Sequence, residues 1–501
     1  MRLSVITIVL LTICSLSFSQ TMPPDHWLGQ EIRFLQNRGQ LWSLSPLNEP
    51  YTISHIRSAM QQLPQDNEFR EFNNTLLVRW PQTGNTGYAL GQWQSAYRNE
   101  KKSRYFHSRE RLGGGAQLND WLHTAATVYV DNRLDEKPSY IGKRQSGQAA
   151  FFEQAYALAL FKSFKVKFGR DVLVWGPGRD ASLLISDNSR PMDHLLFSWH
   201  NDWLEFSFFS ATLNPTFFKV DDKSSTQYRL LSGHRIECRP LPFIYFAISE
   251  TSLSGGPDAG LDFAYLNPFL FHHAINLNGP NTANTMGSLD IAMMPLSKLK
   301  VYGSFLLDDV QIESSVPADR EPPQIGYLAG TNIADPFGFL GVDIFAEYTR
   351  ITNRTYKGQG GPWEKYRHRN QPIGHFLGND FDRVLGGLSY HPNPNHFFQL
   401  TYEHRRQGKG RLDTPFDTPW LDVPEDESYS EPFPTGTVET SRSFSLLTRW
   451  RPAWWFGCEL MARFWNINNY RNQPGVNKEF WDIRFLFNFG FLKKYGLSQN
   501  N

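Results

Sequence analysis

The chain has 501 residues, and its 50 lysines and arginines nearly balance its 49 aspartates and glutamates. This balance gives no electrostatic support for a nucleic-acid partner. The mean hydropathy is −0.46, and beyond the N-terminal segment there is no run of about 18 apolar residues, which excludes a helical membrane protein. Aromatic residues reach 15%, a high value that is expected where strands carry aromatic girdles at two membrane interfaces.

The N-terminus predicts export. Arg2 supplies a positive charge, and Leu3–Leu16 is an apolar run too short to span a bilayer. Small residues then precede Gln20, as in a cleavable signal peptide. Cys14 lacks the small preceding residue of a lipoprotein signal. We therefore expect residues 1–19 to be a signal peptide and the mature protein to reach the cell outer membrane.

The spacing of apolar residues in segment 20–85 predicts short helices. Leu28, Ile32 and Leu35 have helical spacing and end before Gly39. A second helix is expected around Ile53–Leu63, and a third around Phe69–Leu76. Helices this short cannot bury a core alone, so we expect them to dock at the periplasmic mouth of a larger structure. An independent helical adaptor resembling an S-layer homology unit is the alternative.

From about residue 86 to residue 501 the pattern alternates with period two. The last strand places its apolar residues on one face: Trp481, Ile483, Phe485, Phe487, Phe489 and Phe491. Sixteen strands are well marked, and Thr86–Tyr97 and Gln324–Asn332 would bring the total to 18. We predict an all-β fold, a large antiparallel transmembrane β-barrel of 16–18 strands with a short N-terminal periplasmic helical segment.

The connections between strands favour a barrel over a soluble β-sandwich. Short, proline-bearing turns such as Arg239–Pro242 alternate with long polar loops, found at about 251–285, 353–381, 407–440 and 467–480. Outer-membrane barrels have short periplasmic turns and long external loops. This alternation places the C-terminus in the periplasm and the Gly169–Pro191 loop outside.

The Gly169–Pro191 loop is the predicted binding site. It combines a rigid Gly176–Gly178 turn with aromatic, guanidinium, carboxylate and amide groups, and these suit sugar recognition. The candidate polysaccharide-binding residues are Trp175, Arg179, Asp180, Asp187, Asn188 and Arg190. The alternative is that Trp175 and the arginines brace the loop inside the barrel mouth and never touch sugar.

The same stretch carries a family resemblance. Trp175–Asp180 (WGPGRD) and Leu184–Pro191 (LISDNSRP), with Asp25–Trp27, Leu266–Phe269 and Leu306–Asp309, resemble the capsule-assembly Wzi family of outer-membrane proteins. The resemblance covers essentially the whole mature chain. It implies a large barrel with a periplasmic helical bundle at one mouth and a lectin-like role in holding capsular polysaccharide. The tail after Phe491 departs from the usual aromatic C-terminus of such barrels.

The sequence contains no familiar catalytic or metal-binding motif. His272 and His273 are neighbours in a segment taken as strand, where they would point in opposite directions, so no shared metal is expected. Asp308 and Asp309 could form a carboxylate pair for glycoside hydrolysis, but a solvated strand edge is the simpler interpretation. We expect neither enzyme activity nor a cofactor or metal.

Three functional hypotheses remain open. The first is a non-enzymatic, lectin-like monomer in outer-membrane lipid that binds capsular or extracellular polysaccharide and aids its assembly and retention. The second is a diffusion channel whose lumen is lined by Lys165, Lys167, Arg235, Arg239, Glu403, Arg405 and Arg484. The third is a carbohydrate hydrolase. The identity of the glycan is not encoded in any recognisable pattern.

Overall fold

The computed structural model describes residues 21–22, 27–63, 72, 74–75, 85–99, 103–137, 140–145, 147–220, 223–256, 262–278, 283–311, 320–424 and 427–495. The predicted signal peptide and most of the third predicted helix lie outside these ranges. Among the described residues, eighteen antiparallel strands close into one barrel, in which β22 pairs with β2. Both weaker strand predictions, Thr86–Tyr97 and Gln324–Asn332, are confirmed.

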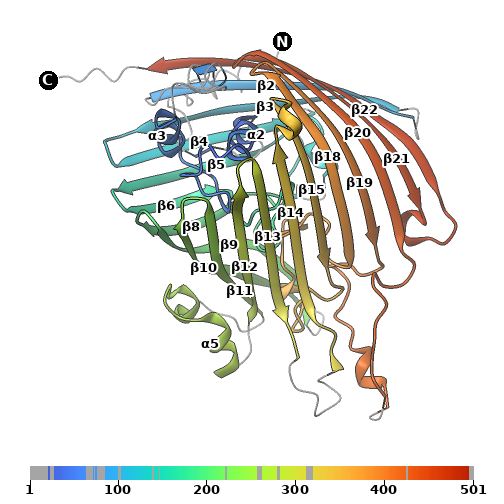
Figure 1. Ribbon diagram of the computed structural model, residues 1–501. Helices are drawn as coiled ribbons and strands as arrows, with labels where there is room; N and C mark the ends of the chain where they lie inside the picture. Colours follow the sequence, from blue (N-terminus) through green and yellow to red (C-terminus); the bar gives the residue numbers. More distant parts are fainter. Residues whose placement is uncertain are drawn as a thin grey trace.

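The barrel strands follow one another in chain order around the wall (Figure 1). They are β2 (Asn85–Arg98), β3 (Ser103–Gln117), β4 (Leu122–Asp131), β5 (Ala149–Phe161), β6 (Phe164–Asp171), β8 (Met192–His200), β9 (Leu204–Val220), β10 (Lys223–Leu241), β11 (Ile244–Gly255), β12 (Ala283–Leu296), β13 (Leu299–Asp309), β14 (Gln324–Ala334), β15 (Val342–Ile351), β18 (Phe381–Asn393), β19 (His396–Gln407), β20 (Glu439–Ala453), β21 (Phe456–Asn468) and β22 (Lys478–Tyr495).

The remaining elements are short. They are the helices α2 (Trp27–Gln36), α3 (Ile53–Gln61) and α5 (His272–Asn278), and the two-residue strands β1 (Asn48–Glu49), β7 (Val174–Trp175), β16 (Arg367–His368) and β17 (Gln371–Pro372). No helix in the described ranges is long and apolar enough to cross a membrane.

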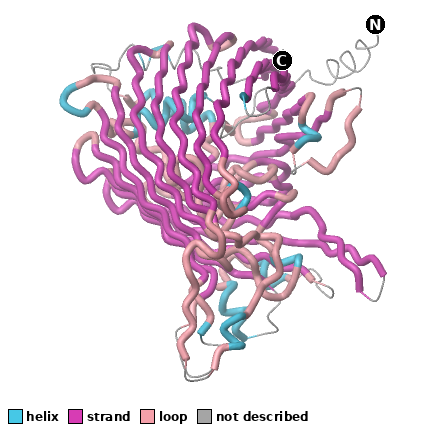
Figure 2. Tube along the Cα trace, turned by 90° about the vertical axis from the view of Figure 1, so that its right-hand side faces the viewer, coloured by secondary structure: helices cyan, strands magenta, loops and turns pink. Residues whose placement is uncertain are grey.

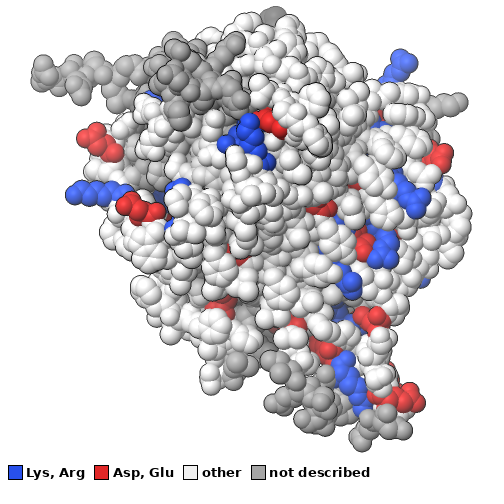
Figure 3. Space-filling view, in the orientation of Figure 1, with Lys and Arg blue, Asp and Glu red and all other residues white. Residues whose placement is uncertain are grey.

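Along each barrel strand, side chains point alternately to the outer face and to the lumen. On β22, Phe485 and Phe487 are exposed on the outer wall, while Asp482 between the apolar positions is buried on the lumen side. Uncharged side chains make up most of the face seen in Figure 3, where charges of both signs gather towards the lower right and smaller groups of them lie at the left edge and the upper centre. The predicted faces of this strand are therefore confirmed.

The helices α2 and α3 lie inside one end of the barrel, which we call the plugged end (Figure 1). Their apolar faces form one cluster, to which Leu28, Ile32, Leu35, Ile53, Ile56 and Met60 belong. Thr52 caps α3 by accepting a hydrogen bond from the His55 backbone N–H at 3.3 Å. These apolar residues have the helical spacing that the sequence predicted, and both helices lie at one mouth of the barrel, within its lumen.

The long connections gather at the opposite end, which we call the loop end (Figure 2). One of them, residues 172–191 between β6 and β8, turns back into the lumen and joins a second apolar cluster. In this cluster it meets the plug and inward side chains of the barrel. The lumen is therefore occupied from the plugged end by helices and from the loop end by this loop.

Candidate functional site

The Gly169–Pro191 loop leaves the loop end of β6 and runs through the barrel interior. Its β7 strand pairs antiparallel with β1 of the plug, with Trp175 opposite Asn48. The Gly176 N–H donates to the Leu47 carbonyl at 2.9 Å. Gly176 has a φ of +127°, a conformation that L side chains rarely adopt. The predicted turn therefore exists, but the plug covers it and it does not project outside.

Trp175 is buried, with 1% of its surface exposed. Its ring meets Phe209 of β9 edge-on, with centroids 5.2 Å apart, and the Arg235 guanidinium lies 5.8 Å from it. Protein thus surrounds the face that was expected to stack on sugar. This placement matches the bracing alternative for Trp175, and a sugar could reach the ring only if the loop left the lumen.

Arg179 and Asp180 carry the loop across to the far wall. The Arg179 N–H donates to Glu347 Oε2 of β15 at 2.8 Å, and its guanidinium lies 3.6 Å above the Phe345 ring. Asp180 Oδ2 accepts a hydrogen bond from Arg383 of β18 at 2.6 Å. Burial alone would raise the pKa of the Asp180 carboxyl, but the Arg383 guanidinium holds that pKa below its usual value. These two residues link β6 to the opposite side of the barrel.

The last three predicted residues lie in different surroundings. The Asn188 side chain donates to the Pro372 carbonyl at 2.9 Å, and Arg190 lies 3.9 Å above Phe151 of β5. The Asp187 side chain is exposed. The structure therefore distributes the six predicted residues over several separate contacts and does not bring them together around one ligand-sized space.

A cavity of about 360 Å³, which no sequence pattern predicted, lies at the loop end and is here called the rim cavity. Three segments form it: the residues before β14, the residues around the end of β15, and part of the β19–β20 loop. Its lining comprises Arg320, Glu321, Pro322, Pro323, Ile325, Arg350, Thr352, Asn353, Arg354, Tyr429, Ser430, Glu431, Pro432, Phe433 and Thr435. The sequence did predict one part of this cavity, because residues 407–440 were expected to form a long polar loop outside the barrel.

Aromatic and guanidinium groups lie together in the rim cavity. The Arg350 guanidinium lies 3.6 Å above the Phe433 ring. Arg354 binds Glu431 through two hydrogen bonds of 2.8 Å, so its charge is already paired. Arg320 donates to the carbonyls of residues 423 and 424 at 2.9 Å and so holds the β19–β20 loop in place. The cavity thus combines a ring face with cations held in fixed positions, as recognition of an acidic sugar requires.

Glu321 gives the rim cavity a titratable group. Its Oε1 accepts a hydrogen bond from Gln324 at 2.7 Å. Burial raises the pKa of the Glu321 carboxyl to about 7, and the nearby Asp309 adds to the shift. Near neutral pH this carboxyl therefore changes its charge.

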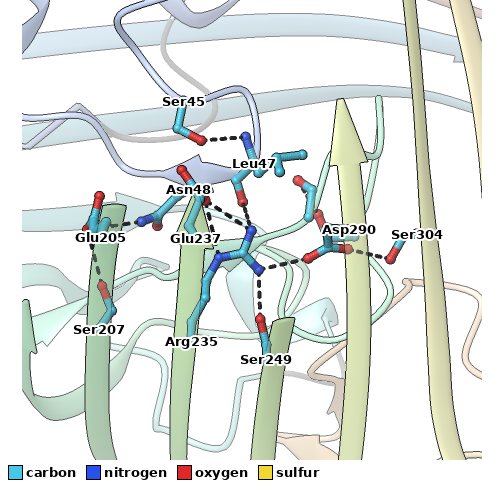
Figure 4. A network of polar contacts seen from close by, with 12 residues as sticks. Ser45, Leu47, Asn48, Glu205, Ser207, Arg235, Glu237, Ser249, Asp290 and Ser304 are labelled. Atoms are coloured by element: carbon cyan, nitrogen blue, oxygen red, sulfur yellow. Dashed lines mark hydrogen bonds and ion pairs between the residues drawn. The ribbon is translucent and has the colours of Figure 1, made fainter. Parts of the chain in front are cut away.

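The charged residues that would line a channel are engaged with one another and with the plug. Arg235 donates to Asp290 at 2.7 Å, to Ser249 at 2.8 Å and to the Leu47 carbonyl at 3.2 Å (Figure 4). The other lumen-facing members have ion-pair partners or turn contacts: Lys165 with Glu205, Lys167 with Asp171, Glu403 with Arg383, Arg405 with Glu439, Arg484 with Asp482, and Arg239 with the Pro242 carbonyl. These groups hold the interior together.

Asp308 and Asp309 lie at the loop end of β13. Asp308 shares its strand face with the buried residues Tyr302 and Leu306 and accepts a hydrogen bond from the Tyr356 N–H at 2.6 Å. Asp309 is the next residue of β13, where the pairing with β14 shifts register between Leu307 and Asp309. The Asp308 carboxylate is therefore engaged in a backbone contact at an irregular strand end.

No curated protein matches the sequence. Among solved structures, the chain resembles Wzi from Escherichia coli, described as an outer membrane protein involved in group 1 capsule assembly and a carbohydrate-binding β-barrel. The TM-score is 0.65 at 15% identity, over 96% of this chain and 100% of that one.

Two further solved structures are more distant. OccAB4 from Acinetobacter baumannii has a TM-score of 0.46 at 10% identity, over 82% of this chain and 99% of that one. OprD from Pseudomonas aeruginosa has a TM-score of 0.45 at 9% identity, over 82% and 96%. The model of the family described as capsule assembly protein Wzi matches residues 63–479. The chain therefore belongs to the Wzi capsule assembly protein family.

Proposed function

We propose that this protein is a non-enzymatic outer-membrane barrel that binds acidic surface polysaccharide and so aids the assembly and retention of a capsule. Family membership over residues 63–479 and the fold shared with the carbohydrate-binding E. coli barrel support this role. The apolar outer wall and the long loops at one end support an orientation with the plugged end in the periplasm and the loop end outside. The barrel closes on itself, which suits a monomer.

The observation that carries the proposal is the rim cavity. The face of Phe433 and the ring of Tyr429 would contact sugar C–H groups, and Arg350 would bind a carboxylate oxygen of a uronic acid. Since Arg320 already fixes the loop that carries both rings, little order has to be gained on binding. The site therefore suits an acidic polysaccharide better than a neutral one.

The Gly169–Pro191 loop enters the proposal with divided roles. Trp175, Arg179 and Asp180 would brace the interior, because each already contacts plug or wall. Asp187, Asn188 and Arg190 would supply polar contacts to sugar where their side chains remain accessible. Conduction by a diffusion channel is the weaker alternative, since the plug and this loop both occupy the lumen. Hydrolysis is the other alternative, and it is weaker because Asp308 already accepts a hydrogen bond from the Tyr356 N–H.

The test uses purified, folded protein and the polysaccharide of the producing cell, compared with a neutral polysaccharide such as dextran. The wild type should bind the acidic polymer and bind dextran weakly. Arg350→Gln and Phe433→Ala should each weaken binding about tenfold, the effect of losing one charge-assisted contact or a ring face. Trp175→Ala should change affinity little. Equal binding of both polymers, or full binding by both cavity variants, would refute the proposed site.

A further inference from the structure

The helix α5 and the turn before it lie against the outer wall of the barrel. Phe269 stacks on Phe206 of β9, with ring centroids 5.8 Å apart and planes 7° from parallel. Phe206 points outward, because it pairs with the exposed Ile236 of β10. The described part of the β11–β12 connection, residues 262–278, therefore packs against the outer face, and Figure 1 draws α5 just below β10 and β11.

This folded-back segment covers polar side chains on a wall that is elsewhere apolar. Glu250 and Ser252 of β11 share a face with Ile248, which is 53% exposed, yet both are buried. On β10, His234 occupies the same face as Ile236. A carboxylate and an imidazole on the outer face of a barrel cost free energy in lipid unless another group pairs with them. The covering segment supplies that partner.

The partner is His272, the first residue of α5. Glu250 Oε2 lies 3.1 Å from His234 Nε2, and the Glu250 carboxylate accepts hydrogen bonds from the His272 N–H at 2.9 Å and the His273 N–H at 2.7 Å. Candidate ligand atoms of His234, Glu250 and His272 all lie within 4.8 Å of one another. The expectation that His272 and His273 lie on a strand was wrong, because both begin a helix and His272 joins the two strand residues.

The ring of His272 is fully buried, and neither of its nitrogens has a hydrogen-bond partner among the described residues. His234 Nδ1 is likewise buried without one. Backbone bonds to Glu250 explain how the helix starts, but they leave these nitrogens unsatisfied at a real cost in free energy. A bound cation would satisfy them. Two imidazoles and one carboxylate are the protein ligands of zinc sites that hold a water in the fourth, tetrahedral position, and the ligand atoms of such sites lie about 3.3 Å apart around the ion.

We propose that His234, Glu250 and His272 bind a divalent transition metal of the zinc class, which fastens the α5 segment to the outer wall. The site stands apart from the rim cavity and does not depend on the proposed polysaccharide binding. Its ligands come from two neighbouring strands and from the segment that covers them, so the metal would link a connection to the barrel. The exposed aromatic residues of that connection, Phe263, Phe269 and Phe271, would then be held towards the surroundings of the wall.

The test uses the full, untagged protein, folded in detergent and stripped with a chelator that is then removed. Addition of Co²⁺ should give the visible absorption of a tetrahedral site, and Zn²⁺ should abolish it at about one equivalent per chain. His272→Ala and Glu250→Gln should each weaken Co²⁺ binding by more than about tenfold. The matched control is His404→Ala, which removes another histidine from the outward face of β19 and should bind normally.

A second readout follows the covering segment itself. Chymotrypsin should cut near Phe269 and Phe271 faster in the stripped protein than in the zinc-loaded protein, while heat-modifiable mobility shows that the barrel is intact. Zinc should protect the wild type and His404→Ala and should not protect His272→Ala. Absence of stoichiometric Co²⁺ or Zn²⁺ binding by the wild type, or equal binding by His272→Ala, would overturn the proposal. A zinc-bound wild type without protection would overturn the fastening role.

Discussion

Arg38 is the residue that ties the helical plug to the barrel wall. Its guanidinium donates to Asp335 at 2.7 Å and to Asp343 at 2.9 Å, and all three side chains are almost fully buried. Arg38→Met would leave Asp343 a buried, uncompensated charge. We expect a loss of about 3–5 kcal/mol of unfolding free energy, since breaking a buried pair from one side is strongly destabilising. Thermal unfolding followed by gel mobility would measure it.

Arg33 of α2, five positions before Arg38, offers the matched control. It lies 3.9 Å from Glu49, with 40% of its own side chain and 18% of the Glu49 side chain exposed. At this distance and exposure the pair contributes at most about 1 kcal/mol, so Arg33→Met should shift the transition little. If both variants unfolded at the same temperature, Arg38 would not be the anchor that its geometry indicates.

Glu321 predicts the pH dependence of polysaccharide binding. Burial raises its pKa to about 7, so the carboxyl gains a proton as the pH falls through neutrality. A uronic acid, whose pKa is close to that of other carboxyls at about 4, stays ionised there. Lowering the pH from about 8 to about 6 should therefore remove a repulsion of about 1 kcal/mol and strengthen binding a few-fold. Titrations of Glu321→Gln should show no such rise, and a rise of equal size in that variant would contradict the role of Glu321.

The strands are the elements that the sequence predicted best. The assignment of the outer and lumen faces can be tested on β22. Phe485 faces outward and Arg484 faces the lumen, as the alternation indicated. Phe485→Arg should cost about 2–4 kcal/mol because it places a charge on the apolar wall. Arg484→Gln should be mild, since Asp482 keeps Arg98 as a partner at 3.3 Å. Comparable costs in a refolding titration would mean that the two faces are misassigned.

Local patterns explain this success and its limits. Period-two alternation and helical spacing depend on neighbouring residues, so strands such as Gln324–Ala334 and the helix Ile53–Gln61 could be predicted from sequence. The direction of a loop depends on contacts with residues far along the chain. Trp175 lies in the lumen, where its backbone pairs with Asn48 and its ring contacts Phe209. Neither contact can be predicted from the residues next to Trp175 in the sequence.

The rim cavity and the α5 segment were missed for the same reason. Arg350 and Phe433 are 83 positions apart by their numbering and meet only when β15 and the β19–β20 loop lie side by side. His272 was assigned to a strand because a helix of only seven residues gives too weak a periodic signal. Residues of the right chemistry could be named from sequence, but their grouping could not.

At the scale of the whole molecule, the occupied lumen predicts low conductance. Helices α2 and α3 close one end, and residues 172–191 cross the interior. In planar bilayers the wild type should conduct poorly, while deletion of residues 25–80 should raise single-channel conductance in protein whose heat-modifiable mobility shows an intact barrel. Large, steady wild-type conductance that the deletion leaves unchanged would favour the diffusion channel.

The central claim is that the loop end of this barrel holds polysaccharide at the cell surface. It is tested most directly by measuring cell-bound and shed polysaccharide in cells that produce Arg350→Gln or Phe433→Ala at wild-type levels in the outer membrane. The matched control is Arg471→Gln, which alters another arginine near an aromatic ring at the loop end, 5.3 Å from Tyr470 and outside the cavity. We predict that the cavity variants lose bound polysaccharide and shed more, while Arg471→Gln behaves as wild type. Unchanged retention in both cavity variants would contradict the claim.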